Sequence, residues 1–363
     1  QNPVGNRKLG NPISGVKNIP GDFGSIAAAV NALNSHFPGE GGVTFQVAAG
    51  HTEQSTSDIL LTASGTATRP IIFKKHGTGA NPLVTRTDAG TVNGYSAGSR
   101  GDGIIIIQGG DYITFDAIDV KAELPGIDYG YYLRKESPTD GCKHVTIKNC
   151  NITMNKGEVR LVSGIHLSNN GPTTDQVSIT SPAGTHSFIT FTGNTIKNVY
   201  FGIFMKGHST YYDNDIVIGT ELSPNTIQDF GSSSSFEAHG IYIENAHNTD
   251  VGYNNINNTA GGGTEFSYNG FGISNKNSIQ GAINIHHNTI TLKSKKSLFY
   301  GIYNTGNGTS KIEFNTINLS NTENGVMSVH FINNNPQLVS SSNLYINNLT
   351  FASSVYPACN RAL

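Results

Sequence analysis

The amino-acid sequence predicts an all-β solenoid, in which short strands wind into coils that stack along one axis. Two short phrases recur with a period of about 30 residues, and Asn-, Gly- and Ser-rich turns separate them. Too few residues lie between the phrases for crossover helices, so each strand is expected to pair with its equivalent in the next coil. The first phrase, Gly-apolar-x-apolar or a close variant, begins at Gly103, Gly130, Gly164, Gly202, Gly240, Gly272 and Gly301. The second, apolar-x-Asn-x-apolar, ends at Ile196, Ile227, Ile256, Ile290, Ile317 and Leu349.

The composition supports an extracellular β protein. Charged residues make up 13% of the 363 residues, which is about half of the usual share of roughly 25%. Helical bundles and coiled coils are rich in Ala, Glu, Lys and Leu. This low share of charged residues therefore argues against both classes. A net charge of −2 offers no basic footprint for nucleic acid. No stretch approaches the roughly 18 consecutive apolar residues of a membrane helix.

The N-terminal part differs from the repeats. Residues 1–40 are expected to form an extension with a short capping helix, because Ile26, Ala29, Val30 and Leu33 make an apolar stripe at helical spacing. Asp22 or Ser25 is expected to cap the start of this helix. Residues 41–363 are expected to form a single β-helix domain, and the sequence leaves open whether it is part of a longer protein.

The repeated asparagines have a physical explanation. At each bend of a coil the backbone leaves polar groups unpaired inside the stack, and an inward amide supplies both a donor and an acceptor. Cys150 occupies the same slot in an earlier copy and is expected to be a buried apolar residue, although a Cys142–Cys150 disulfide is the alternative. The predicted ladder consists of Asn194, Asn225, Asn254, Asn288, Asn315 and Asn347.

Strand alternation predicts an outward face of rings beside charges. If the residue after each repeated Gly points inward, the next one points outward. Aromatic rings stack on sugars and charges fix hydroxyl or carboxylate groups, although outward rings also simply favour strands. The first outward column is Ile105, Tyr132, His166, Phe204, Tyr242, Ser274 and Tyr303. The second is Ile107, Arg134, Ser168, Lys206, Glu244, Lys276 and Thr305.

Over residues 40–355 this pattern resembles the right-handed parallel β-helix family with the pectate-lyase-like fold. That family includes lyases, glycosidases, tailspikes and adhesins, so the resemblance implies a fold more than a reaction. The run from Ile19 to Glu53 also resembles the start of secreted surface β-helix proteins of gliding, Bacteroidetes-type bacteria. This second resemblance implies a secreted, cell-surface location and outer-membrane export machinery as a partner.

A polysaccharide lyase needs a base for the proton next to a uronate carboxylate and a cation that neutralises this carboxylate. Lys206 is the candidate for either role, and Arg134, His166 and Glu244 are the other catalytic candidates. The candidate substrate-binding residues are Tyr132, Phe204, Tyr242, Lys276 and Tyr303.

A glycoside hydrolase instead needs two carboxyl groups, about 5–5.5 Å or about 6.5–9.5 Å apart. Glu244 with Glu237, or Asp213 with Asp215, are the candidates, but the paired DxD and GHG motifs of polygalacturonase-like enzymes are not matched. The Asp213-Asn214-Asp215 turn is a weak candidate for Ca²⁺, with an ordinary polar turn as the alternative. No other cofactor is predicted.

Two functional hypotheses therefore remain. The first is a secreted carbohydrate-active protein that binds an extracellular polysaccharide and cleaves it as a lyase or a hydrolase. The second is a non-catalytic adhesin or stalk module on the cell surface, which fits the low charge and the unmatched catalytic motifs.

Overall fold

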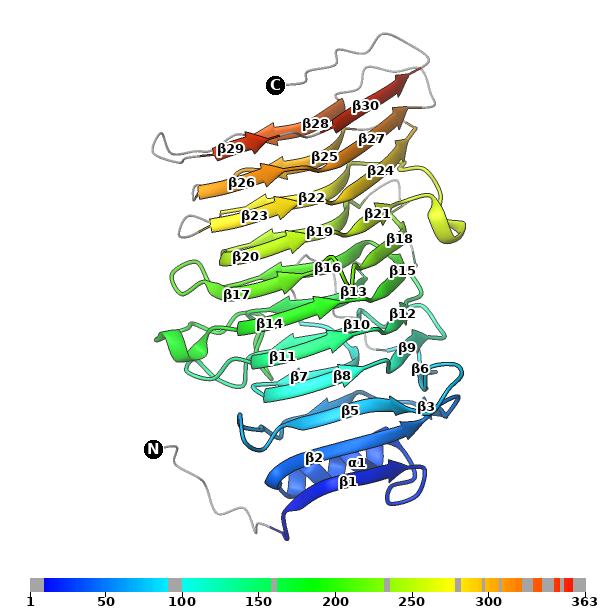
Figure 1. Ribbon diagram of the computed structural model, residues 1–363, viewed down its shortest axis with the longest axis vertical. Helices are drawn as coiled ribbons and strands as arrows, with labels where there is room; N and C mark the ends of the chain where they lie inside the picture. The colour runs from blue at the N-terminus through cyan, green and yellow to red at the C-terminus, as the bar shows by residue number, and fades with distance from the viewer. Residues whose placement is uncertain are drawn as a thin grey trace.

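The chain folds into a right-handed parallel β-helix, as the repeats predict (Figure 1). The computed structural model describes residues 10–90, 100–157, 162–231, 236–277, 282–295, 298–306, 309–321, 329–334, 343–346 and 349–354. Each full coil contributes one strand to each of three parallel sheets, which are named A, B and C in the order in which the chain visits them. The sequence phrases account for sheets B and C. The strands of sheet A were not anticipated as a separate set.

The strands of each sheet follow one another up the axis in chain order. Sheet A contains β1 (Ile13–Ile19), β2 (Pro38–Ala48), β5 (Ile71–His76), β8 (Asp111–Asp116), β11 (Lys143–Lys148), β14 (Ser187–Thr192), β17 (Asp213–Ile218), β20 (Ala246–Gly252), β23 (Ala282–His286), β26 (Thr309–Glu313) and β29 (Asn343–Ile346). Sheet B contains β3 (Thr52–Ser55), β6 (Leu83–Arg86), β9 (Asp119–Ala122), β12 (Asn151–Thr153), β15 (Thr195–Val199), β18 (Thr226–Phe230), β21 (Asn255–Asn257), β24 (Thr289–Ser294), β27 (Thr316–Asn321) and β30 (Leu349–Ser354). Sheet C contains β4 (Ile59–Leu61), β7 (Gly103–Gln108), β10 (Tyr129–Arg134), β13 (Ser163–Ser168), β16 (Phe201–Lys206), β19 (Ala238–Glu244), β22 (Gly270–Lys276), β25 (Phe299–Asn304) and β28 (Val329–Asn334).

The N-terminal helix closes the first coil. Helix α1 (Ile26–Ser35) buries Ile26, Ala29, Val30 and Leu33, as its periodicity predicts. Ser25 is the N-cap, and its hydroxyl accepts a hydrogen bond from the backbone N–H of Ala28. The Glu53 carboxylate accepts two further N–H groups of the first turn. Strand β1 was not predicted. It pairs with β2 beside the helix and extends sheet A below the first coil (Figure 1).

The asparagine ladder is confirmed from Asn194 to Asn315. Each side-chain amide donates to a carbonyl oxygen, and neighbouring amides bond at 2.9–3.1 Å. The side chains of Asn194, Asn225, Asn288 and Asn315 also accept a backbone N–H of the coil before them. Asn347 lies outside the described residues. The ladder residues themselves do not take a left-handed conformation. Instead, the residue before the amide has positive φ, as at Gly193, Tyr253 and His287, and this bends the chain from sheet A into sheet B.

The two described cysteines are buried and free, so the Cys142–Cys150 disulfide is not formed. Cys150 lies at the end of the ladder, where its backbone N–H donates to Asn194 at 3.0 Å. Burial raises the pKa of each thiol to about 12, so both remain protonated at neutral pH. Cys359 lies outside the described residues.

Replacing a ladder amide is expected to destabilise the solenoid. The Asn254 side chain bonds Ile218, Asn225 and Asn288, so Asn254→Leu leaves buried polar groups unpaired. The free energy of unfolding is expected to fall by roughly 1–3 kcal/mol for each of these groups. Denaturant unfolding measures the loss. The adjacent and exposed Asn255 provides the control, since Asn255→Leu should have little effect. Equal stability of the two variants would show that the ladder is not needed.

Candidate functional site

The candidate site is the outer face of sheet C. Its strands pair in the register that the sequence predicts from Tyr132 onward, through His166, Phe204, Tyr242 and Ser274 to Tyr303. The earliest copy was aligned wrongly by one residue. Ile106 pairs with Tyr132 and Gln108 with Arg134, so Ile105 and Ile107 belong to the inner face.

A second column of rings on this face was missed. It consists of the residue before each repeated Gly, which also points outward by strand alternation. The signal was present in the sequence, because an aromatic residue or histidine precedes most of these glycines. In register order the column is Tyr129, Ser163, Phe201, His239, Phe271 and Tyr300.

The rings of both columns stack on one another along the axis. His166 and Phe204 have centroids 4.5 Å apart with planes 4° from parallel, and Phe204 and Tyr242 lie 4.9 Å apart at 1°. Tyr132 is fully buried, and Tyr242 is only 7% exposed. The expectation that these rings offer open faces to sugars is therefore wrong. A role for Tyr132, Phe204 or Tyr242 in substrate binding stays a prediction. Of the three, Tyr242 is the most exposed, at 7%, whereas Tyr132 and Phe204 are 0% and 1% exposed.

His166 does not have the properties of a catalytic base. Its ring is stacked between Tyr129 and Phe204, and the residue is only 1% exposed. Burial holds the pKa of His166 well below its ordinary value. Its Nε2 atom has no hydrogen-bond partner, and Nδ1 faces the Ser163 hydroxyl at 3.3 Å. The side chain is packed as a neutral aromatic ring and does not reach solvent for proton transfer.

The second outward column brings charges together on β16, β19 and β22. Lys206, Glu244 and Lys276 pair on successive coils, with Lys206 Nζ 3.4 Å from Glu244 Oε2. The Tyr242 hydroxyl donates to the same carboxylate at 2.5 Å. This bond and burial raise the pKa of Tyr242 above its ordinary value, with burial as the larger cause. We call these four residues the lysine–glutamate patch.

The ammonium group of Lys276 lies over aromatic rings of its own and neighbouring coils. Its Nζ atom is 5.2 Å from the ring centroid of Tyr242, 5.9 Å from that of Tyr303 and 6.0 Å from that of Phe271. Ser274 stands in the first ring column between Tyr242 and Tyr303. The Lys276 side chain is half-buried on the outer face, and its contacts with the rings are of the cation–π kind.

Arg134 does not join this patch. It lies over the Tyr132 ring at 5.8 Å and donates from Nε to Gln108 at 2.8 Å, which directs it toward the preceding coil. Buried Ser168 occupies the coil between Arg134 and Lys206. The two cations are therefore two coil steps apart, about 10 Å.

The carboxylate pairs proposed for a hydrolase are not brought together. Glu237 precedes β19 and Glu244 ends it, so about 20 Å of extended strand separates them. Glu237 instead faces His239 Nε2 at 3.6 Å, and this interaction lowers the pKa of Glu237 to about 2. Burial lowers the pKa of His239 to about 4, so a neutral imidazole faces the carboxylate.

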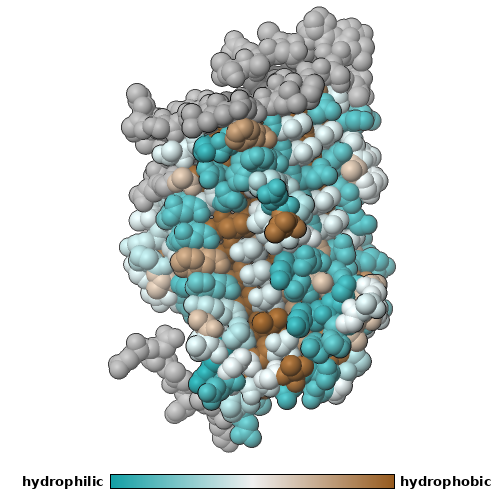
Figure 2. Space-filling model, in the orientation of Figure 1, coloured by the Kyte–Doolittle hydropathy of each residue, from teal (hydrophilic) through white to brown (hydrophobic). Residues whose placement is uncertain are grey.

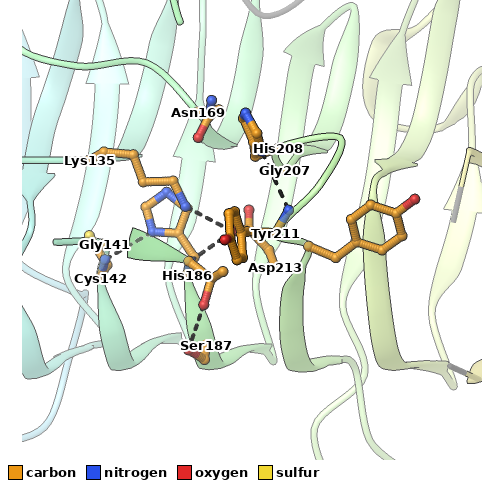
Figure 3. A network of polar contacts seen from close by, with 12 residues as sticks. Lys135, Gly141, Cys142, Asn169, His186, Ser187, Gly207, His208, Tyr211 and Asp213 are labelled. Carbon is orange, nitrogen blue, oxygen red and sulfur yellow. Dashed lines mark hydrogen bonds and ion pairs between the residues drawn. The ribbon is translucent and has the colours of Figure 1, made fainter. Parts of the chain in front are cut away.

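Asp213 and Asp215 also have separate surroundings. Asp213 is buried at the start of β17, where its carboxylate binds Lys135 Nζ at 2.8 Å and the backbone N–H of His186 at 2.7 Å (Figure 3). Asp215 lies on the outer face of sheet A. The buried Lys135–Asp213 ion pair links the C-terminal end of β10 to the start of β17. The Asp213 carboxylate is therefore already paired with a cation. No group of three or more potential metal-binding side chains occurs in the described part of the chain.

Neither a protein-family model nor a curated protein sequence matches the chain. Among solved structures, alginate lyase from Paenibacillus sp. str. FPU-7 is similar, with a TM-score of 0.50 and 15% identity over 88% of this chain and 97% of that one. GH136 lacto-N-biosidase from Eubacterium ramulus is similar with a TM-score of 0.55 and 12% identity over 89% of this chain. This chain covers 64% of that enzyme, which is less than two thirds of its length. Both similarities show a shared parallel β-helix fold. No helix within the described ranges is long and apolar enough to cross a membrane.

His166→Phe is expected to reduce the acid sensitivity of the fold. Below pH about 6.5 the unfolded chain protonates this histidine while the buried ring stays neutral, so stability falls as the pH falls. For one such histidine the free energy of unfolding falls by about 2 kcal/mol between pH 7 and pH 5. Phe204 shows that Phe fits this column.

Denaturant unfolding at the two pH values measures the difference between wild type and variant. If the free energy of unfolding of the His166→Phe variant falls between pH 7 and pH 5 as much as that of the wild type, His166 titrates in the folded state. His166 would then again be a candidate for the base.

Proposed function

We propose that the lysine–glutamate patch binds an acidic extracellular polysaccharide along the outer face of sheet C. The observation behind this proposal is the alternation of Lys206, Glu244 and Lys276 on three successive coils. Ammonium groups bind carboxylate-bearing sugars, and the two lysine positions are two coil steps apart, about 10 Å. Neighbouring units of an anionic chain that runs along the axis would meet both cations.

Cleavage by β-elimination is the reaction that suits these groups. Lys206 and Lys276 would neutralise a uronate carboxylate, which eases removal of the proton on the adjacent carbon. The Glu244 carboxylate would accept that proton, and the Tyr242 hydroxyl would donate its own proton to the leaving glycosidic oxygen. The carbon–oxygen bond breaks as a carbon–carbon double bond forms. Lys206 is assigned to charge neutralisation because its ammonium group already pairs with Glu244.

A non-catalytic adhesin or stalk module is the second candidate. It is favoured by the contacts of Glu244, which is bound by both Lys206 and Tyr242 and thus suits a surface that binds without reacting. Secretion to the outer surface of a gliding-type bacterium, with export machinery as a partner, belongs to both candidates. The sequence resemblance at the N-terminus and the low charge support it.

Lys206→Ala is expected to weaken binding of alginate or polygalacturonate by about ten- to a hundredfold, because a charge-assisted contact contributes about 1.5–3 kcal/mol. Calorimetry measures binding, and the ultraviolet absorbance of the unsaturated product measures cleavage. Lys121→Ala is the control, since Lys121 also forms an ion pair, with Glu123 on sheet B, away from the lysine–glutamate patch. Tyr242→Phe should abolish cleavage and leave most of the binding.

The proposal fails if the wild type binds no acidic polysaccharide, or if Lys121→Ala weakens binding as much as Lys206→Ala. Binding by the wild type without any unsaturated product would select the adhesin.

A further inference from the structure

The outer face of sheet A holds an open hollow that the proposed function does not use. Sheet A faces the viewer in Figure 1, and Figure 2 shows hydrophobic residues, in brown, among hydrophilic ones on this side of the molecule. The hollow has a volume of about 550 Å³ and lies across β11, β14, β17 and β20. Its size falls in the range of about 300–1,000 Å³ that is usual for ligand pockets.

One side of the hollow is a column of aromatic residues that stops partway. Tyr112, His144 and Phe188 occupy equivalent positions on successive coils and are stacked at 4.2 and 4.5 Å. The next two positions are Asp215 and Asn248. All five residues have positive φ, so the backbone has the same shape at each position.

Phe188 therefore has one ring face covered by His144 and no ring over the other within the described residues. The residue is 50% exposed, whereas the stacked rings of sheet C are at most 7% exposed for Phe204 and Tyr242. An uncovered aromatic face at a fixed position is what a sugar ring needs for stacking. This is the feature that the outer face of sheet C was expected to provide.

Polar groups surround the uncovered ring. The floor is formed by Thr146, Thr190, Val217 and Asp250, which pair in register, and Asp215 and Asn248 lie along the edge. Asp250 is held by His286 at 3.0 Å, and this hydrogen bond keeps the pKa of Asp250 below its ordinary value. Carboxylate and amide oxygens accept hydrogen bonds from sugar hydroxyl groups.

We infer that this hollow is a second glycan-binding site, specific for a neutral sugar chain. The charge decides the class of ligand: two carboxylates and no lysine or arginine line the hollow, so a uronate or sulfated sugar is repelled. The lysine–glutamate patch on sheet C has the opposite preference. The inference is independent of the proposed function, since the two sites share no residue.

The test uses cellohexaose, mannohexaose and laminarihexaose as neutral probes, with binding followed by calorimetry on the full chain. Phe188→Asn removes the ring but keeps a residue that tolerates positive φ, and it is expected to weaken binding of the preferred probe roughly tenfold. Asp215→Asn, which is nearly isosteric, is expected to weaken it severalfold. Phe188→Tyr should retain binding.

Phe314→Asn is the matched control, because Phe314 is also an exposed, positive-φ ring stacked on a histidine. Lys121→Ala, on sheet B, is the control for a charge change outside the hollow, and both controls should bind as the wild type does. The inference is overturned if the wild type binds none of the three probes, or if Phe314→Asn weakens binding as much as Phe188→Asn. It is also overturned if Asp215→Asn, folded by circular dichroism, binds like the wild type; this variant decides the matter should Phe188→Asn not fold.

Discussion

Parallel hydrogen bonding between successive coils is the constraint on which the rest of this molecule depends. It sets equivalent residues about 4.8 Å apart, so that every side chain has its counterparts directly above and below. An amide such as Asn254 therefore bonds the next amide, and a ring such as Phe204 covers the next ring. The environment of a residue in this fold is decided by its column across coils more than by its neighbours in the chain.

This constraint also explains why the outward rings of sheet C are buried. Strand alternation turns these rings away from the interior of the solenoid. The distance between equivalent residues of adjacent coils, however, is close to the centroid distance of two stacked rings, 4.5–4.9 Å here. The faces are therefore occupied by other rings, and a buried histidine such as His166 behaves as another aromatic residue. Partial exposure to solvent remains at the charged positions at the end of these strands, where the side chains of Lys206, Glu244 and Lys276 are only half-buried.

Interruptions of a column create the opportunities for ligands. On sheet C, Ser274 replaces a ring, and the ammonium group of Lys276 lies over the rings of nearby positions. On sheet A, the aromatic column ends at Phe188 and continues as Asp215, which leaves one ring face uncovered. The two places differ in charge: two lysines and one glutamate form the patch on sheet C, and two aspartates line the hollow on sheet A. The two proposed sites therefore differ in the ligand charge that they would accept.

The sequence by itself determined the solenoid, the capping helix and the asparagine ladder, because each depends on a local pattern that repeats with the coil. It also placed Tyr242, Lys206 and Glu244 on one outer face, since that follows from alternation alone. The tertiary structure decided what no single strand encodes: the burial of His166 and the pairing of Lys135 with Asp213. The first depends on rings supplied by adjacent coils, and the second joins residues 78 positions apart in the chain. The uncovered face of Phe188 was likewise decided in three dimensions, because it exists only where the neighbouring coil lacks a ring.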